Sequence, residues 1–366
     1  MLAHLEATDF RNFEAFQIAP GPGFNMIYGP NGSGKSSLLE SIYLLGMGRS
    51  FRARLVSRAI RHEANKLMVV GQIADEYGNK VPVGIERPRH GTGKIRVNGS
   101  TVQSIAELAS MLPVQLINQD SYHLVEGGPK FRRQFIDWGL FHVEQNFFKL
   151  WKRSQQLLLQ RNAELRNSAN SSQIKAWDKE FVLAATELSE LRESYVNRLL
   201  EVLSPILVNL KGIPDWSITY LPGWDRARDL QEVLSTSFAR DIQIGHTQHG
   251  PHRADLHICI NGVPAHEVLS RGEQKLFVYA LRLAQGILLR GLVGKKCIYL
   301  IDDLPAELDT ARQQQVIEIL KGLESQVFVT GTALQQLRVF LEEDSTACYF
   351  KMENDQVHRE SSFTQN

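Results

Sequence analysis

The sequence predicts an α/β protein with two lobes of mixed sheets and an inserted α-helical arm domain. Three observations predict this organisation. A glycine-rich loop at 29–36 follows the apolar, strand-like run 24–28, and a second apolar run at 297–301 ends in Asp302 and Asp303. Between these runs, the alternation typical of strands gives way to apolar residues spaced three and four apart, which is typical of helices.

We assign the two-lobed part to residues 1–120 together with 245–366, and the helical arm to 121–244. The first 120 residues contain alternating apolar segments separated by polar turns. Two Asn-Gly pairs, Asn98-Gly99 and Asn261-Gly262, supply the positive φ angles of tight hairpin turns.

The arm is expected to contain an antiparallel helical hairpin. A first helix covers roughly 141–166, and a heptad pattern runs from Ile174 to Tyr195 in a second helix that we expect to end at Pro205. The polar run 168–172 separates the two helices. The alternative is that both are ordinary core helices of a small helical subdomain.

Composition limits the class of protein. The 366 residues carry a net charge of only +1, so any contact with nucleic acid must come from local charge. The three cysteines lie far apart without a Cys-x-x-Cys pair, which fits a reducing cytosol rather than a disulfide framework or a zinc ribbon. No signal peptide precedes the first strand, and two arginines interrupt the longest apolar stretch, so we expect a cytoplasmic protein without a membrane span.

The glycine-rich loop has the spacing of a P-loop. Its glycines let consecutive backbone N–H groups converge on phosphate oxygens at the start of the next helix. Lys35 is expected near the β and γ phosphates of ATP, and the Ser36 hydroxyl is expected to bind Mg²⁺. The predicted nucleotide contacts in this segment are Gly29, Pro30, Asn31, Gly32, Ser33, Gly34, Lys35, Ser36 and Ser37.

Two further segments contain residues suited to Mg²⁺ and to the γ-phosphate of ATP. Asp302 ends a buried strand, the position from which a carboxylate holds the Mg²⁺ shell, and Asp303 could orient or deprotonate the attacking water. The plainer alternative is that the two acids only cap a strand. Residues 269–275 place Ser270 at the N-cap of a helix with Gly272 beside it, an arrangement suited to a γ-phosphate.

These motifs together resemble the RecF family of bacterial DNA-repair ATPases, part of the ABC/SMC-like group. The resemblance runs almost end to end, and several of the matching segments are peculiar to that family, so it does not rest on the generic P-loop. The matching segments are 9–13, the P-loop, 48–52, 127–137, 250–255, 270–275 and 302–309.

The resemblance implies an ABC-type ATPase head with a short arm in place of a long coiled coil. It also implies an ATP-dependent homodimer that binds double-stranded DNA at junctions with single strands and helps RecA load, together with RecO and RecR, with a link to the SOS response. Lys35 and Asp303 become the catalytic residues, and Ser36 and Asp302 the Mg²⁺ ligands. Ser270, Gly272 and Gln274 become contacts to the ATP held by the partner subunit, and Asp309 a link between the two sites.

The chain departs from the general ABC pattern at three places. Asp303 stands where a glutamate is usual, so we expect slow hydrolysis and a higher turnover for Asp303→Glu. Only Thr330 and Thr332 offer side chains where a switch histidine is usual. Gln119 is the candidate glutamine for the nucleotide, with Gln115 as the alternative.

A basic run between Gly48 and Arg61 contains no acid and suits contact with a DNA backbone. The alternatives are a solvated basic surface or a clasp between domains. The candidate residues are Arg49, Arg52, Arg54, Arg58 and Arg61. A zinc site at His246, His249 and His252 is disfavoured by the Gly-Pro pair between them.

Two other functions remain open from the residues. A transporter ATPase subunit would need a groove for a membrane partner and no basic DNA face. A scaffold that uses ATP only to dimerise would keep its repair function in a Lys35→Arg variant.

Overall fold

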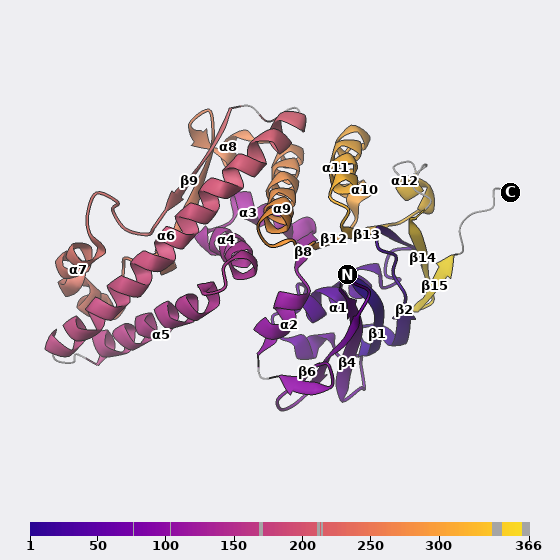
Figure 1. Cartoon of the computed structure of the whole chain (residues 1–366), viewed down its shortest axis with the longest axis horizontal. Helices are drawn as coiled ribbons and strands as arrows, with labels where there is room; N and C mark the ends of the chain where they lie inside the picture. Colours follow the sequence, from indigo (N-terminus) through magenta and orange to yellow (C-terminus); the bar gives the residue numbers. More distant parts are fainter. Residues whose placement is uncertain are drawn as a thin grey trace. The chain divides into compact units, whose positions relative to one another are not determined.

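The computed structural model describes residues 1–75, 77–102, 104–167, 171–210, 213, 215–338 and 346–360. They form two compact units (Figure 1). The first unit comprises Met1–Ser121 and Leu281–Asn366, and the second comprises Tyr122–Ala280.

The first unit contains a six-stranded antiparallel sheet in the order β2-β1-β4-β5-β6-β7. Alternation sets its register, since Leu67 and Val69 of β4 are buried while Lys66 and Met68 are exposed. The hairpin predicted at Asn98-Gly99 is confirmed, with φ angles of 49° and 80°. The strands are Leu2–Phe10 (β1), Phe13–Ile18 (β2), Lys66–Ala74 (β4), Lys80–Pro88 (β5), Lys94–Val97 (β6) and Ser100–Val102 (β7).

A second six-stranded sheet of this unit has the order β15-β14-β3-β13-β12-β8, and all its pairs except β14–β15 are parallel. Its three central strands, β3, β13 and β12, are buried at every position, as expected for parallel strands covered on both faces. The strands are Phe24–Tyr28 (β3), Val114–Ile117 (β8), Ile298–Ile301 (β12), Gln326–Gly331 (β13), Cys348–Glu353 (β14) and Gln356–Glu360 (β15).

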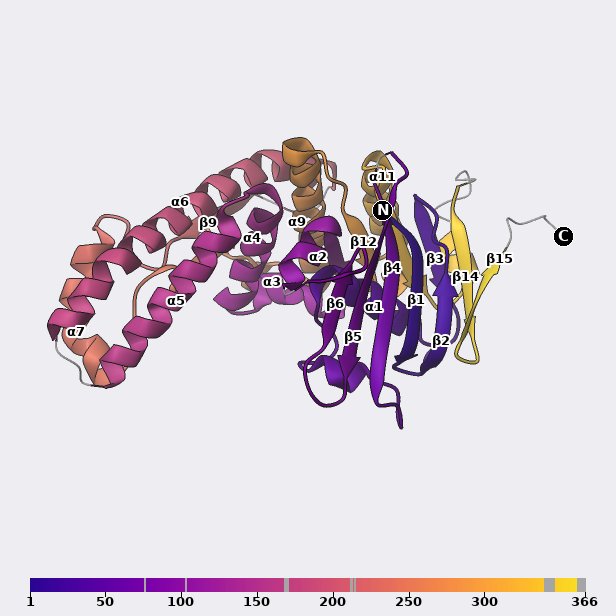
Figure 2. The same ribbon diagram turned by 60° about the horizontal axis from the view of Figure 1, so that its bottom comes forward.

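Helix α1 (Lys35–Met47) packs against strands of both sheets (Figure 2). Its side chains are buried almost all round. One apolar core joins α1 to both sheets. The remaining elements of the unit are η1 (Val56–Ala59), α2 (Ile105–Met111), η2 (Gln119–Tyr122), α10 (Leu304–Glu307), α11 (Thr310–Gly322) and α12 (Leu334–Arg338).

The second unit is built on two long helices, α5 (Phe147–Arg166) and α6 (Ser171–Asn209), which pack along each other (Figure 1). The expected end of the second helix at Pro205 is wrong, because α6 continues to Asn209. Buried Ile206 and Leu207 hold this last turn against the unit, which offsets the hydrogen bond that proline cannot donate.

The other elements of this unit are α3 (His123–Glu126), α4 (Pro129–Val143), β9 (Trp216–Leu221), α7 (Leu230–Ile244), η3 (Pro251–Arg253), β10 (Asp255–Ile260), β11 (Val263–Pro264) and α8 (Ala265–Val268). The strand order is β11-β10-β9, and β10 turns into β11 at Asn261-Gly262 with φ angles of 50° and 79°. Helix α9 (Arg271–Val293) begins in this unit and ends in the first.

The compact units place the second boundary at 280/281, whereas the sequence suggested 244/245. Pairing between β10 and β9 explains the difference, since it ties residues after 245 to the helical segment. Arg132 of α4 adds an ion pair to Asp255 at 2.6 Å, and Arg192 of α6 donates to the Pro251 carbonyl at 2.7 Å.

A fully buried arginine joins three elements of the second unit. Arg161 of α5 pairs with Asp178 of α6 at 2.6 Å and with Asp241 of α7 at 2.8 Å. It also donates to the Thr247 hydroxyl at 2.8 Å. Because a buried charge needs such partners, this cluster fixes α7 to the helical pair.

His252, one of the three histidines considered for zinc, has a structural partner. His252 Nε2 lies 3.0 Å from the Thr247 carbonyl oxygen, and burial lowers the pKa of His252 to about 4. Within the described residues, no group of three or more His, Cys, Asp or Glu is placed to hold a metal ion. One described helix, α9, is long and apolar enough to cross a membrane by composition, but 67% of that stretch is buried, as in a core helix.

Candidate nucleotide-binding site

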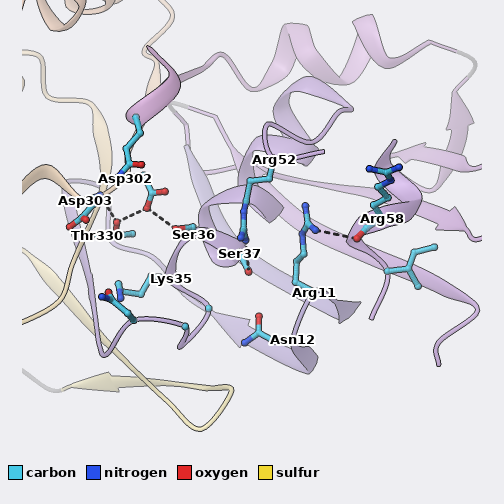
Figure 3. Close-up of a pocket in the computed structure, with 15 residues that line it drawn as sticks. Arg11, Asn12, Lys35, Ser36, Ser37, Arg52, Arg58, Asp302, Asp303 and Thr330 are labelled. Atoms are coloured by element: carbon cyan, nitrogen blue, oxygen red, sulfur yellow. Dashed lines mark hydrogen bonds between the residues drawn. The ribbon is translucent and has the colours of Figure 1, made fainter. Parts of the chain in front are cut away.

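A cavity of about 630 Å³ opens at the carboxyl ends of the parallel strands in the first unit (Figure 3). Ligands bind at this edge of parallel sheets because strand ends and helix starts converge there. The lining residues all belong to the first unit. They are Arg11, Asn12, Asn31, Gly32, Gly34, Lys35, Ser36, Ser37, Arg52, Arg58, Ile60, Gln119, Asp302, Asp303 and Thr330.

The predicted P-loop connects the end of β3 to α1. Gly32 and Gly34 have φ angles of 84° and 96°, which side chains rarely adopt. At Gly34 a Cβ atom would also lie 2.3 Å from Phe13 Cζ, so the residue must be glycine for two reasons. The backbone N–H groups at the start of α1 therefore face the cavity, as anion binding requires.

Lys35 lies folded back on its own loop. Its Nζ donates to the carbonyl oxygens of Gly29 at 2.8 Å and Pro30 at 2.9 Å. Burial lowers the pKa of Lys35, and the nearby Asp303 and Asp302 oppose that shift. A cation held by neutral carbonyls at the mouth of a helix is placed to bind an added anion.

The P-loop and the end of β12 meet at a pair of oxygen donors. Ser36 Oγ donates to Asp302 Oδ1 at 3.0 Å (Figure 3). Hydroxyl and carboxylate oxygens are the ligands that Mg²⁺ prefers. Ser33 Oγ, also in the loop, is buried with no hydrogen-bond partner among the described residues, but Ser33 does not line the cavity. These features fit a nucleotide with its cation.

Asp303, the residue after Asp302, has an unusual backbone conformation. Its φ and ψ angles of 58° and 48° lie in the left-handed region, at the N-cap of the short helix α10. Asp tolerates this region better than most residues, because its short side chain can bond locally. The expected test with Asp303→Glu therefore changes backbone strain as well as side-chain length.

The structure distinguishes between the two candidate glutamines and between the two threonines at the switch position. Gln119 lines the cavity, whereas Gln115 is buried in a polar cluster with Gln285 and Arg282. Thr330 also lines the cavity, whereas the Thr332 hydroxyl donates to Gln336 Oε1 at 3.1 Å on the surface.

The five arginines proposed for DNA divide into groups. Arg52 and Arg58 line the nucleotide cavity, and Arg52 Nη1 donates to Ser37 Oγ at 3.3 Å. Arg61 pairs with Asp9 at 2.9 Å. Arg49 and Arg54 are exposed on the surface of the first unit.

Arg11 and Asn12 line the cavity although the sequence assigned them no role there. Arg11 forms two hydrogen bonds, of 2.8 and 2.6 Å, to Glu40, a carboxylate with 0% exposure in α1. It also donates to the Arg58 carbonyl at 3.1 Å. A glutamate between the apolar runs Leu38-Leu39 and 42–45 of one helix is the signal that could have revealed a buried cationic partner.

The predicted partner-facing segment lies in the second unit. Ser270 caps α9, because Glu273 Oε2 accepts from Ser270 N at 2.8 Å and from Ser270 Oγ at 2.7 Å. Ser270 is exposed and Gly272 half-exposed, so both are accessible. Gln274 is buried and donates to the Leu269 carbonyl at 3.0 Å, so it stabilises the turn before the helix.

A family model described as the RecF/RecN/SMC N terminal domain matches residues 1–357. The chain belongs to the RecF family. A relative from Pseudomonas paraeruginosa, named DNA replication and repair protein RecF, is 44% identical over 357 residues, which cover 97% of each chain. A relative of the same name from Azotobacter vinelandii is also 44% identical, over 97% of this chain and 98% of its own.

Solved structures agree with this assignment. The recombination mediator protein RecF of the RecFOR pathway, in complex with ATP, superposes with a TM-score of 0.87 at 26% identity, over 98% of this chain and 97% of its own. An SMC head bound to the C-winged helix domain of ScpA has a TM-score of 0.60 at 18% identity, over 98% of this chain and 97% of its own, and shows the fold alone. The predicted ABC-type α/β fold is thereby confirmed.

The two P-loop glycines provide a matched test of the site in this RecF-family chain. Gly32→Ala adds only backbone strain, since nothing lies within 4 Å of its Cβ position. We expect it to weaken ATP binding about tenfold, the equivalent of 1–2 kcal/mol. Gly34→Ala adds the collision with Phe13 and should weaken binding at least about 100-fold.

The dissociation constant of a fluorescent ATP analogue measures both variants, with circular dichroism as the control for folding. Equal affinities for the two variants would contradict the geometry described for the loop.

Proposed function

We propose that this chain is an ATP-dependent recombination mediator with weak ATPase activity, acting on DNA in the cytoplasm. The observation that carries the proposal is the contact between Ser36 of the P-loop and Asp302 of β12 inside one cavity. Family membership and the likeness to ATP-bound RecF support ATP as the ligand.

The proposed roles follow from the positions of the side chains. The backbone N–H groups of 31–36 and the Lys35 ammonium would bind the phosphates of ATP, and Ser36 and Asp302 would hold Mg²⁺. Bound Mg²⁺ neutralises charge that develops on the phosphates. Asp303 would orient the attacking water and take its proton, with Gln119 beside the same cavity.

The second half of the proposed site is contributed by another copy of the chain. Ser270 and Gly272 lie at the exposed start of a long helix, where backbone N–H groups and the helix dipole favour an anion. We therefore infer an ATP-dependent homodimer, with each Ser270 segment on the partner's γ-phosphate.

The DNA and protein partners follow from the family. RecF of the RecFOR pathway is a recombination mediator, and this supports RecR with RecO as partners and help with RecA loading at junctions between double and single strands. A link to the SOS response belongs to the same proposal. Among the arginines, exposed Arg49 and Arg54 suit the DNA backbone best.

The two rival functions are weaker. A transporter subunit does not explain 44% identity to DNA replication and repair proteins over nearly the whole chain. A scaffold that never hydrolyses ATP gives Asp303 no role. Its left-handed backbone is of the kind that clusters at active sites, which favours a role in hydrolysis.

The variant Asp303→Asn tests the proposed ATPase. Asn keeps the left-handed backbone and the size of the side chain but cannot accept the proton. We expect ATP binding to remain and hydrolysis to fall at least about 100-fold, within the range of general base catalysis. Anisotropy of a labelled duplex with a single-stranded tail should show ATP-dependent binding that persists longer than in the wild type.

Lys35→Ala serves as the control and should lose the effect of ATP on DNA. Hydrolysis at the wild-type rate in Asp303→Asn would show that Asp303 has no catalytic role. Equal DNA affinity of the wild type with and without ATP would refute the proposed dependence of DNA binding on ATP.

Neighbouring arginines give a separate prediction. Arg54→Ala should leave ATP affinity unchanged. The logarithm of its DNA-binding constant should fall less steeply with the logarithm of the salt concentration, with a slope smaller in magnitude by about 1. Arg52→Ala should instead weaken ATP binding about tenfold, because a charged donor at the cavity is lost. Salt titrations of DNA binding and nucleotide titrations measure the two effects. If Arg52→Ala changed only the DNA slope, its assignment to the nucleotide cavity would be wrong.

A further inference from the structure

Thr330 is fully buried at the end of β13 and contacts both acids of the candidate site. Its Oγ1 donates to Asp302 Oδ1 at 2.7 Å and accepts from the backbone N–H of Asp303 at 2.7 Å (Figure 3). A hydroxyl has a single proton, so donation to Asp302 and acceptance from Asp303 fix its orientation.

Strand register places the hydroxyl there. Val329 of β13 pairs with Ile301 of β12, so the next residue on each strand is Thr330 and Asp302. On the other side, Thr330 pairs with Ile27 of β3, two residues before the P-loop begins. The threonine therefore stands between the strand that carries the acids and the strand that leads into the phosphate-binding loop.

The two hydrogen bonds on Asp302 Oδ1 come from different parts of the fold. Ser36 Oγ belongs to the P-loop and would bind Mg²⁺ through a lone pair while its proton stays on Asp302, whereas Thr330 is fully buried on β13. Thr330 is thus the contact that holds the carboxylate from outside the P-loop. The same oxygen satisfies the Asp303 N–H in the left-handed conformation that sets the direction of the Asp303 side chain.

We propose that Thr330 is a positioning residue for ATP hydrolysis, whose hydroxyl fixes the Asp302 carboxylate for the cation and the Asp303 backbone for the attacking water. This proposal rests on the proposed ATPase function and assigns Thr330 no contact with the γ-phosphate. It replaces the sequence-based expectation of a hydroxyl at the switch position with a role behind the two acids.

Thr330→Val isolates the hydroxyl, because valine keeps the shape of the side chain and removes both hydrogen bonds. Groups that orient a metal ligand typically contribute 10–100-fold to metal affinity or activity. We expect the Mg²⁺ concentration for half-maximal hydrolysis to rise at least about tenfold and kcat to fall by a similar factor. Affinity for a fluorescent ATP analogue in EDTA should stay at the wild-type value, since the P-loop is untouched.

Thr330→Ser is the matched rescue, because it restores the hydroxyl and should return the Mg²⁺ midpoint toward the wild-type value. A merely structural role would lower the melting temperature and the active fraction without moving that midpoint. If Thr330→Val hydrolyses ATP with the wild-type Mg²⁺ midpoint and kcat, the proposal is overturned. Failure of the wild type itself to hydrolyse ATP would instead refute the proposed ATPase function on which the inference depends.

Discussion

The parallel pairing of β3, β13 and β12 is the constraint on which the candidate site depends. Three chain segments end at one edge of the sheet, although β3 ends at Tyr28 and β12 begins only at Ile298, and each segment delivers a polar group there. β3 leads into the P-loop, β12 ends at Asp302, and β13 carries Thr330. Because a slip of one residue would turn the side chains of a strand to its other face, this register must be kept for the donors to meet.

Burial of β3, β13 and β12 keeps their register in place. The strands are covered on both faces, with α1 packed against the core that joins the two sheets. The bidentate contact from Arg11 to the buried Glu40 adds a connection between the first sheet and α1, one helical turn beyond Ser36. Arg52 lies 3.9 Å from the same carboxylate, so two arginines surround the buried Glu40, and we regard this cluster as part of the support for the phosphate loop.

The features that could be predicted from the sequence are those determined by residues that are neighbours along the chain. The P-loop, the strand that ends in Asp302 and the Asn98-Gly99 hairpin each have a pattern confined to neighbouring residues, and the sequence located them. The contacts of Thr330 depend on the pairing of β13 with β12, and those of Arg11 on the packing of the β1–β2 turn against α1. The buried Glu40 signals a cationic partner, but neighbouring residues do not identify which one. The unit boundary at 280/281 likewise depends on β10 pairing with β9. Arg52 and Arg54 are two positions apart in one basic run and both are exposed, and only the folded loop shows that Arg52 lines the cavity and Arg54 does not.

In the proposed homodimer, the Ser270 segment of a second copy completes the cavity of the first unit. Light scattering in ATP and Mg²⁺, with and without duplex DNA, gives the mass of the wild type and of Ser270→Arg. We expect a wild-type dimer, and a variant that binds ATP yet remains monomeric because the arginine blocks the partner's γ-phosphate. If the wild type stays monomeric even on DNA, or if Ser270→Arg dimerises as readily as the wild type, the shared site is contradicted.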